Sequence, residues 1–170
     1  MKVSIFILLA CGLLACGSVF GQNEYQQQLI SEINTLAARI ESHPSVELYV
    51  QRSGAIFLLN SVSEHQTWVP FAIGDAINDI NSAIALSPRD PLLYSLRAEY
   101  KRDINRDYAG AVSDMDKAIE LDPDNPEWYL QRANYRNLSF GCMDYRQCAI
   151  MGDKRCREIV QEACGGMAPL

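Results

Sequence analysis

Residues 107–123 read DYAGAVSDMDKAIELDP, and this stretch decides the fold class. Ala111, Met115 and Ala118 follow one another at intervals of four and three residues, which places their side chains on one face of an α-helix. Pro123 cannot occupy a helix interior, so the helix ends before it. The stretch therefore predicts one amphipathic helix that buries a face of small and apolar side chains.

The same pattern recurs along the chain with a fixed period. Segments 48–52, 93–97 and 128–132 open alike, each with Tyr in second place and Arg in fifth. Agreement among independent landmarks indicates an internal repeat and not an irregular bundle with accidental similarity. Three pairs of landmarks are each separated by 35 residues: Ala76 and Ala111, Pro88 and Pro123, and Tyr94 and Tyr129.

Each repeat unit is expected to contain two helices. The first begins at Pro91 or Pro126, because a first helical turn tolerates proline. The second ends before Pro88 or Pro123. Small side chains such as Ala98 let the two helices cross closely. One such pair cannot bury its own apolar faces, so the units are expected to stack on their neighbours.

The segment 94–123 resembles a unit of the tetratricopeptide-repeat (TPR) family, and the resemblance extends over residues 46–152. It implies an all-α fold, an α-solenoid of about three TPR-like helix pairs arranged as a right-handed superhelix. The three pairs are expected at about residues 46–90, 91–125 and 126–152.

Both ends of the solenoid are expected to be capped. Residues 22–45 would form an N-terminal capping helix, and residues 153–170 a C-terminal capping helix and tail. The units also depart from the family period of about 34 residues. The first is longer, the middle one has an extra residue near 104–107, and the third is shorter between Arg132 and Gly141. The N-terminal helix is indicated by an apolar stripe of Leu29, Ile33, Leu36 and Ile40.

Residues 1–21 are interpreted as a secretory signal peptide and not as a buried helix. Lys2 precedes an apolar run from Ile5 to Ala15, and a small-residue region follows it. The run is too short to span a bilayer as a mature helix, so no membrane-spanning segment is expected after signal removal. Because the C-terminus also resembles exported bacterial TPR proteins, we expect a periplasmic, envelope-associated or secreted protein of a Gram-negative bacterium.

Two processing routes remain open. Val19-Phe20-Gly21 before Gln22 fits ordinary signal peptidase and is slightly favoured. Leu13-Leu14-Ala15-Cys16 resembles a bacterial lipobox, in which Cys16 would carry a lipid anchor. On that alternative, the protein would be a structural lipoprotein of an envelope assembly.

The charge of the chain argues against nucleic acid as a partner. The formal net charge is −6, and removing residues 1–21 takes away one lysine and no acid, which leaves −7. An acidic chain repels phosphate backbones. A protein or peptide is therefore the expected partner.

No catalytic constellation is visible in the sequence. His43 and His65 are the only histidines, and neither lies in a known catalytic context. Asp114 and Asp116 are interpreted as solvated residues of a helix face and not as an acid–base pair. No phosphate-binding glycine loop is present. Neither enzymatic activity nor a cofactor or metal is expected.

Four cysteines, Cys142, Cys148, Cys156 and Cys164, lie near the C-terminus. In an exported protein an even set predicts two disulfides. A zinc site is the alternative, and it is less favoured because closely spaced cysteine pairs are absent.

The predicted helical hairpin discriminates between the pairings. On a single helix, about 9 Å would separate Cys142 from Cys148 along the axis, and about 12 Å would separate Cys156 from Cys164. A disulfide tolerates a Cα separation of only about 7 Å. Facing residues of an antiparallel hairpin have a nearly constant sum of residue numbers, which favours Cys142–Cys164 and Cys148–Cys156. Cys142 and Cys148 lie about 120° apart around an ideal helix, so Cys142–Cys164 is the better supported bond.

The resemblance also implies where a partner would bind. First helices of TPR units line a concave face, and an extended or helical segment fits its mixed apolar and acidic lining. The candidate positions do not carry the combined Lys/Asn/Arg set with which chaperone-binding TPR domains hold a C-terminal carboxylate. The candidate partner-binding residues are Glu47, Val50, Phe57, Leu92, Ser95, Glu99, Arg102, Glu127, Leu130 and Asn134, with Gly54 and Asn137 at two further positions.

The insertion at residues 61–74 supplies two more candidates, Trp68 and Phe71. Exposed aromatic side chains can anchor a partner. We favour the alternative that both fold back onto the core, because long loops pack under their own side chains.

Overall fold

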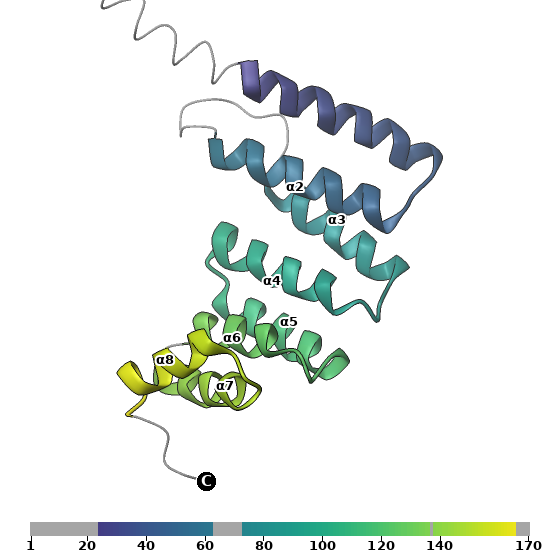
Figure 1. Ribbon diagram of the computed structural model, residues 1–170. Helices are drawn as coiled ribbons and strands as arrows, with labels where there is room; N and C mark the ends of the chain where they lie inside the picture. The colour runs from purple at the N-terminus through teal and green to yellow at the C-terminus, as the bar shows by residue number, and fades with distance from the viewer. Residues whose placement is uncertain (1–23, 63–72, 137, 166–170) are drawn as a thin grey trace, which may run out of the picture. The chain divides into compact units, whose positions relative to one another are not determined.

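The computed structural model describes residues 24–62, 73–136 and 138–165, and these ranges are helical and contain no strand. The all-α, TPR-like solenoid class expected from the sequence is confirmed. The signal peptide, the lipobox, Trp68, Phe71 and Asn137 lie outside the described residues. The helices are residues 24–42, α2 (Val46–Val62), α3 (Ile73–Leu86), α4 (Pro91–Asn105), α5 (Tyr108–Leu121), α6 (Pro126–Tyr135), α7 (Leu138–Ile150) and α8 (Lys154–Ala163) (Figure 1).

The chain divides into two compact units, residues 1–76 and 77–170, with the boundary inside α3. In the first unit, the helix at 24–42 and α2 run antiparallel. The Gln26 side chain donates a hydrogen bond to the Val62 carbonyl at 3.2 Å, while Leu36 and Ile40 pack against Leu48. The apolar stripe read from the sequence is therefore the buried face of this hairpin.

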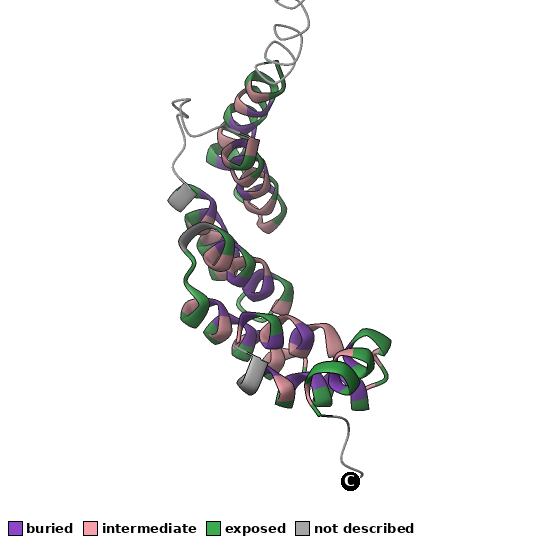
Figure 2. Cartoon of the chain, turned by 90° about the vertical axis from the view of Figure 1, so that its left-hand side faces the viewer, coloured by how far each residue is buried: buried purple, intermediate pink, exposed green. Residues whose placement is uncertain are grey.

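The core of the second unit begins where α4 crosses α5. Ala98, Ala111 and Ala118 are fully buried at this crossing, and Tyr94 and Met115 fill the space beside them. Figure 2 shows that buried residues lie on the helix faces turned toward neighbouring helices, with exposed residues outside. Small residues at the crossing let the two backbones approach, and Trp128 and Tyr135 of α6 complete the same core cluster.

Three helices of this unit begin in the same way. Asp90, Asn125 and Asp153 each precede a helix in extended backbone conformation, and each side chain accepts a hydrogen bond from a first-turn backbone N–H. The N–H groups belong to Leu92 at 3.0 Å, Glu127 at 3.1 Å and Cys156 at 3.2 Å. The starts of α4, α6 and α8 are thus fixed by the same local chemistry, which gives their residues a common numbering from the cap.

The short third pair has its missing residues in the first helix. α6 has 10 residues, whereas α4 has 15. The following helix comes unusually close, since a Cβ at Gly141 would lie 2.8 Å from the Ala133 carbonyl oxygen. Glycine is required at this crossing of α6 and α7 because a methyl group would collide with backbone.

Repeated ion pairs join the helices of the second unit. Arg97 of α4 binds Asp114 of α5 through two hydrogen bonds, and its third nitrogen donates to Asn81 of α3 at 2.7 Å. Arg132 of α6 is 35 residues further on and binds Asp144 of α7 and Asp116 of α5. Each arginine therefore connects the second helix of its own pair to the second helix of the preceding pair.

The interpretation of Asp114 as a solvated residue is wrong. Its side chain is only 5% exposed and also pairs with Lys101 at 2.8 Å, whereas the Asp116 side chain is 51% exposed. Asp79, 35 residues before Asp114, is buried as well. The signal was present in the sequence, because Asp79 and Asp114 share a repeat position, as do Arg97 and Arg132.

Candidate functional site

In the second unit, the first helices α4 and α6 lie side by side and form one face, here called the first-helix face. The Ser95 hydroxyl of α4 donates a 2.8 Å hydrogen bond to the Gln131 side chain of α6. Further along, the Arg102 guanidinium stacks over the Tyr135 ring at 5.1 Å from its centre. These contacts bring the expected binding positions of α4 and α6 onto neighbouring helices.

The exposure of the candidate residues on this face is uneven. Leu92 is 62% exposed, and Glu99 and Asn134 are also exposed. Arg102 and Glu127 are partly exposed. Leu92 is therefore the apolar group that the face offers most openly to a partner.

Two expected partner-binding residues offer little surface. Ser95 is 8% exposed and Leu130 is 7% exposed. Ser95 is engaged by Gln131, while Leu130 packs in a core cluster with Tyr145 and Cys148. These two positions are corrected to packing residues, because the neighbouring helices cover them.

The first unit holds the remaining described candidates on α2. Glu47 is exposed and accepts a hydrogen bond from the Gln51 side chain at 3.2 Å, while Val50 and Phe57 are half-buried. The same unit has an open groove of about 600 Å³ that the sequence did not suggest. It is lined mainly by polar residues: Gln28, Ser31, Glu32, Thr35, Leu36, Arg39 and Gln51.

Acidic side chains surround Tyr135 on the first-helix face. Burial raises the pKa of the Tyr135 phenol; the carboxylates of Glu99, Asp103 and Glu127 act in the same direction, and Arg102 acts against them. Two of these carboxylates are neutralised locally. Asp103 pairs with Arg102 at 2.8 Å, and Glu127 pairs with Arg155 of α8 at 2.6 Å.

Glu99 is the remaining carboxylate of this group. Among the described residues it has no salt-bridge partner within 4 Å. Its charge contributes to raising the pKa of Arg102, after the larger effect of the hydrogen bonds to Asp103. Leu92 and Glu99 are both exposed on α4, about two helical turns apart, so this helix offers an apolar group and a carboxylate to a partner.

The four C-terminal cysteines form two disulfides that tie α8 to α7. Cys142 is bonded to Cys164 and Cys148 to Cys156, with Cα–Cα distances of 5.7 and 5.8 Å. These are the two pairs that the hairpin register favours, and both bonds are present. Cys148 and Cys156 are completely buried, while Cys142 and Cys164 are half-buried.

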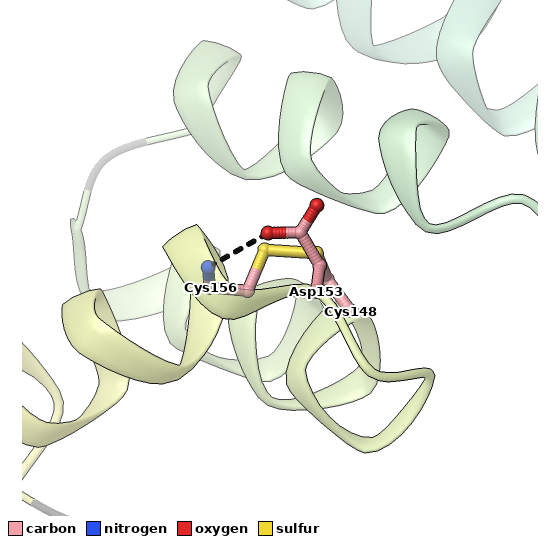
Figure 3. Close-up of side chains that lie close together, drawn as sticks. All are labelled: Cys148, Asp153 and Cys156. Carbon is pink, nitrogen blue, oxygen red and sulfur yellow. Dashed lines mark hydrogen bonds between the residues drawn. A yellow bond between two sulfur atoms is a disulfide. The ribbon is translucent and has the colours of Figure 1, made fainter.

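A carboxylate lies beside the buried disulfide. Figure 3 shows the Asp153 side chain next to Cys148 and Cys156, with one oxygen accepting from the Cys156 backbone N–H. The two sulfurs and a carboxylate oxygen lie within 4.8 Å of one another. Metal ligation requires thiolates. The sulfurs are bonded to each other here, so Asp153 serves as a helix cap.

Within the described ranges, no helix has the length and hydrophobicity that a membrane-spanning segment needs.

Comparison with known proteins finds similarity in structure only. No family model and no curated protein sequence matches the chain. The first TPR of Spaghetti (RPAP3), bound to the HSP90 peptide SRMEEVD, aligns with a TM-score of 0.55 at 16% identity, over 71% of this chain and 94% of that one. The Arabidopsis OM64 TPR domain gives 0.55 at 18%, over 71% and 95%. The MamA protein gives 0.57 at 15%, over 81% and 68%.

Proposed function

Proceeding from the tetratricopeptide-repeat fold of this chain, we propose that it is a non-enzymatic scaffold that binds a segment of a partner protein on its first-helix face. The observation that carries the proposal is that Leu92 and Glu99, about two turns apart on α4 next to α6, are both exposed. A large apolar side chain that the fold leaves in water can gain burial from a partner.

The chemistry of the face indicates which segments it would accept. The similar TPR structure of RPAP3 holds the peptide SRMEEVD, which carries three acidic residues. Glu99 would repel such a peptide, and Arg102, the one basic residue among the candidate positions, is already bound to the Asp103 carboxylate. An apolar segment with few acidic residues therefore fits this face better.

We further propose that the protein works outside the cytoplasm. The two disulfides support this, because such bonds persist in oxidising compartments and are rare in the cytosol. The signal peptide interpretation of residues 1–21 points the same way. Intact mass of the protein isolated from its native cells is the check, since a chain beginning at Gln22 carries no lipid and a chain beginning at a lipidated Cys16 is heavier.

The binding proposal is tested by affinity capture from native cell-envelope extract. Wild-type protein, Leu92→Ser and Glu99→Lys serve as bait, and Glu120→Lys is the matched control because its side chain is 67% exposed on α5. We expect the first two variants to lose the partner that wild type and control retain. Thermal unfolding monitored by circular dichroism shows whether each bait is folded. Retention of the same partner by both face variants would contradict the proposal.

A further inference from the structure

The C-terminal helix α8 packs against α6, as α6 packs against α4. Arg155 is the second residue after the cap Asp153, and it reaches Glu127, the second residue after the cap Asn125. On α4 and α6 the hydrogen bond from Ser95 to Gln131 joins the fifth residue after one cap to the sixth after the other. Residues at equal distances from their caps therefore lie at about the same level along neighbouring helices.

Counting from the caps places two further residues of α8 at the levels of the first-helix face. Glu158 is the fifth residue after its cap, at the level of Ser95 and Leu130. Glu162 is the ninth, at the level of Glu99 and Asn134. Both Glu158 and Glu162 are exposed, whereas Ser95 and Leu130 at the fifth level are buried.

The charges on α8 reinforce the acidity of this face. Arg155 forms ion pairs with Glu127 and Asp153, and the Arg157 side chain donates a hydrogen bond to the Gly152 carbonyl. Lys154 approaches Glu158 at 3.8 Å, but both side chains are largely exposed, so this pair neutralises little. Counted from the caps, Glu99 and Glu162 lie at the ninth level on the two sides of Asn134, whose amide oxygen accepts a hydrogen bond from the Tyr145 hydroxyl.

The disulfides make α8 a fixed part of the unit. The Cys148–Cys156 bond attaches the first turn of α8 to α7, and Cys156 directly follows Arg155. The Cys142–Cys164 bond attaches the C-terminal end of α8 to α7. A helix of 10 residues is marginal by itself in water, but bonds at both ends hold it in register. The position of its carboxylates is therefore set before any partner arrives.

We infer that α8 is the third helix of the binding face, and that Glu99 and Glu162 together select a partner segment rich in lysine and arginine. The inference rests on the proposed function. Neighbouring packed helices lie about 8–10 Å apart, so the two carboxylates are separated by about 16–20 Å across α6. An extended chain advances about 3.3 Å per residue, which puts the matching basic residues about five or six positions apart. Leu92 supplies an apolar contact on the same helix as Glu99, about two helical turns before it.

The test measures binding of short fluorescein-labelled peptides to the full disulfide-bonded protein by fluorescence anisotropy. One peptide has two lysines six positions apart, with a leucine outside the pair next to one lysine, in a Ser/Gly background, and its match has glutamates in place of the lysines. We expect the lysine peptide to bind wild type more tightly than the glutamate peptide. Glu99→Lys and Glu162→Lys should each weaken it about fivefold, the effect of one exposed ion pair, and Glu120→Lys should not.

The outcomes separate the two proposals. If Glu99→Lys weakens the lysine peptide and Glu162→Lys does not, α8 is outside the face, and the proposed function stands without it. Equal binding of the two peptides to wild type overturns the inference about partner chemistry, whereas the capture experiment judges the proposed function independently. Equal weakening by Glu120→Lys would show an effect of total charge and would also overturn it.

Discussion

Arg97 of α4 and Asp114 of α5 are held together by two parallel hydrogen bonds of 2.9 and 2.6 Å at the edge of the buried helix crossing. Arg132 and Asp144 repeat the arrangement in the next pair with bonds of 3.0 and 2.6 Å. Both arginines also stack on the tyrosine three residues before them, at 5.5 and 5.6 Å. The repeat therefore conserves a polar joint between its helices as well as an apolar one.

Removing the charge of Asp114 should destabilise the fold. Asp114→Asn leaves Arg97 and Lys101 without their shared carboxylate, in a place where the Asp114 side chain is only 5% exposed. We expect the free energy of unfolding to fall by about 2–3 kcal/mol, measured by urea denaturation. The control Asp116→Asn removes a carboxylate whose side chain is 51% exposed, and it should cost much less. Equal losses in the free energy of unfolding would show that the buried ion pair stabilises the fold no more than the exposed one.

Arg106→Gly should stabilise the protein. Arg106 follows α4 with φ of 51°, a left-handed conformation that its Cβ disfavours, and it is the only non-glycine residue with positive φ among the described residues. Glycine at this position relieves the strain, with an expected gain of up to about 1 kcal/mol in thermal or urea unfolding. The control is Arg89→Gly in the turn before α4, where φ is not positive and glycine should only add unfolded-state entropy. A gain of the same size at both positions would contradict the explanation.

The two disulfides should be reduced in a fixed order. Cys142 and Cys164 are half-buried, while Cys148 and Cys156 have no exposed surface. Thiol–disulfide exchange needs access to a sulfur, so a dithiol reductant should open Cys142–Cys164 first in the native protein. Alkylation at intervals followed by peptide mass spectrometry measures the order. Simultaneous labelling of all four cysteines would mean that α7 and α8 unfold before either bond is reduced.

The start of α8 should be weakened by acid through Asp153. Hydrogen bonds from the Arg155 side chain hold the pKa of the Asp153 carboxyl below its ordinary value of 3.8. A lowered folded-state pKa means that the charged form favours folding above pH 3.8, and that this contribution disappears as pH falls below it. Asp153→Asn keeps a capping side chain without the charge.

The comparison of wild type with Asp153→Asn across pH tests this directly. Their difference in the free energy of unfolding should be constant near neutral pH. The difference should shrink as pH falls below about 3.8. Asp124→Asn, at an exposed residue of the turn before α6, is the control. A difference that persists undiminished at pH 2 would assign the effect to shape and not to charge.

Much of the fold could be predicted because the relevant signals are local. Asp90, Asn125 and Asp153 cap the helices that follow them, and Pro88 and Pro123 stop the helices before them, through contacts within a few residues. The alanines at the α4–α5 crossing recur with the period of the repeat. The pairing of Cys142 with Cys164 followed from the arithmetic of a hairpin, since a short antiparallel connection leaves little freedom of register.

The amino-acid pattern alone predicts an all-α repeat with helix starts at Pro91 and Pro126 and helix ends before Pro88 and Pro123. The burial of Asp114 in an ion pair, the covering of Leu130 and the pairing of Arg155 with Glu127 are visible only in the folded protein. Helix formation depends on neighbours along the chain, whereas burial and charge pairing depend on which face another helix covers. That choice is made by residues far apart in sequence, so the binding face had to be read from the packed molecule.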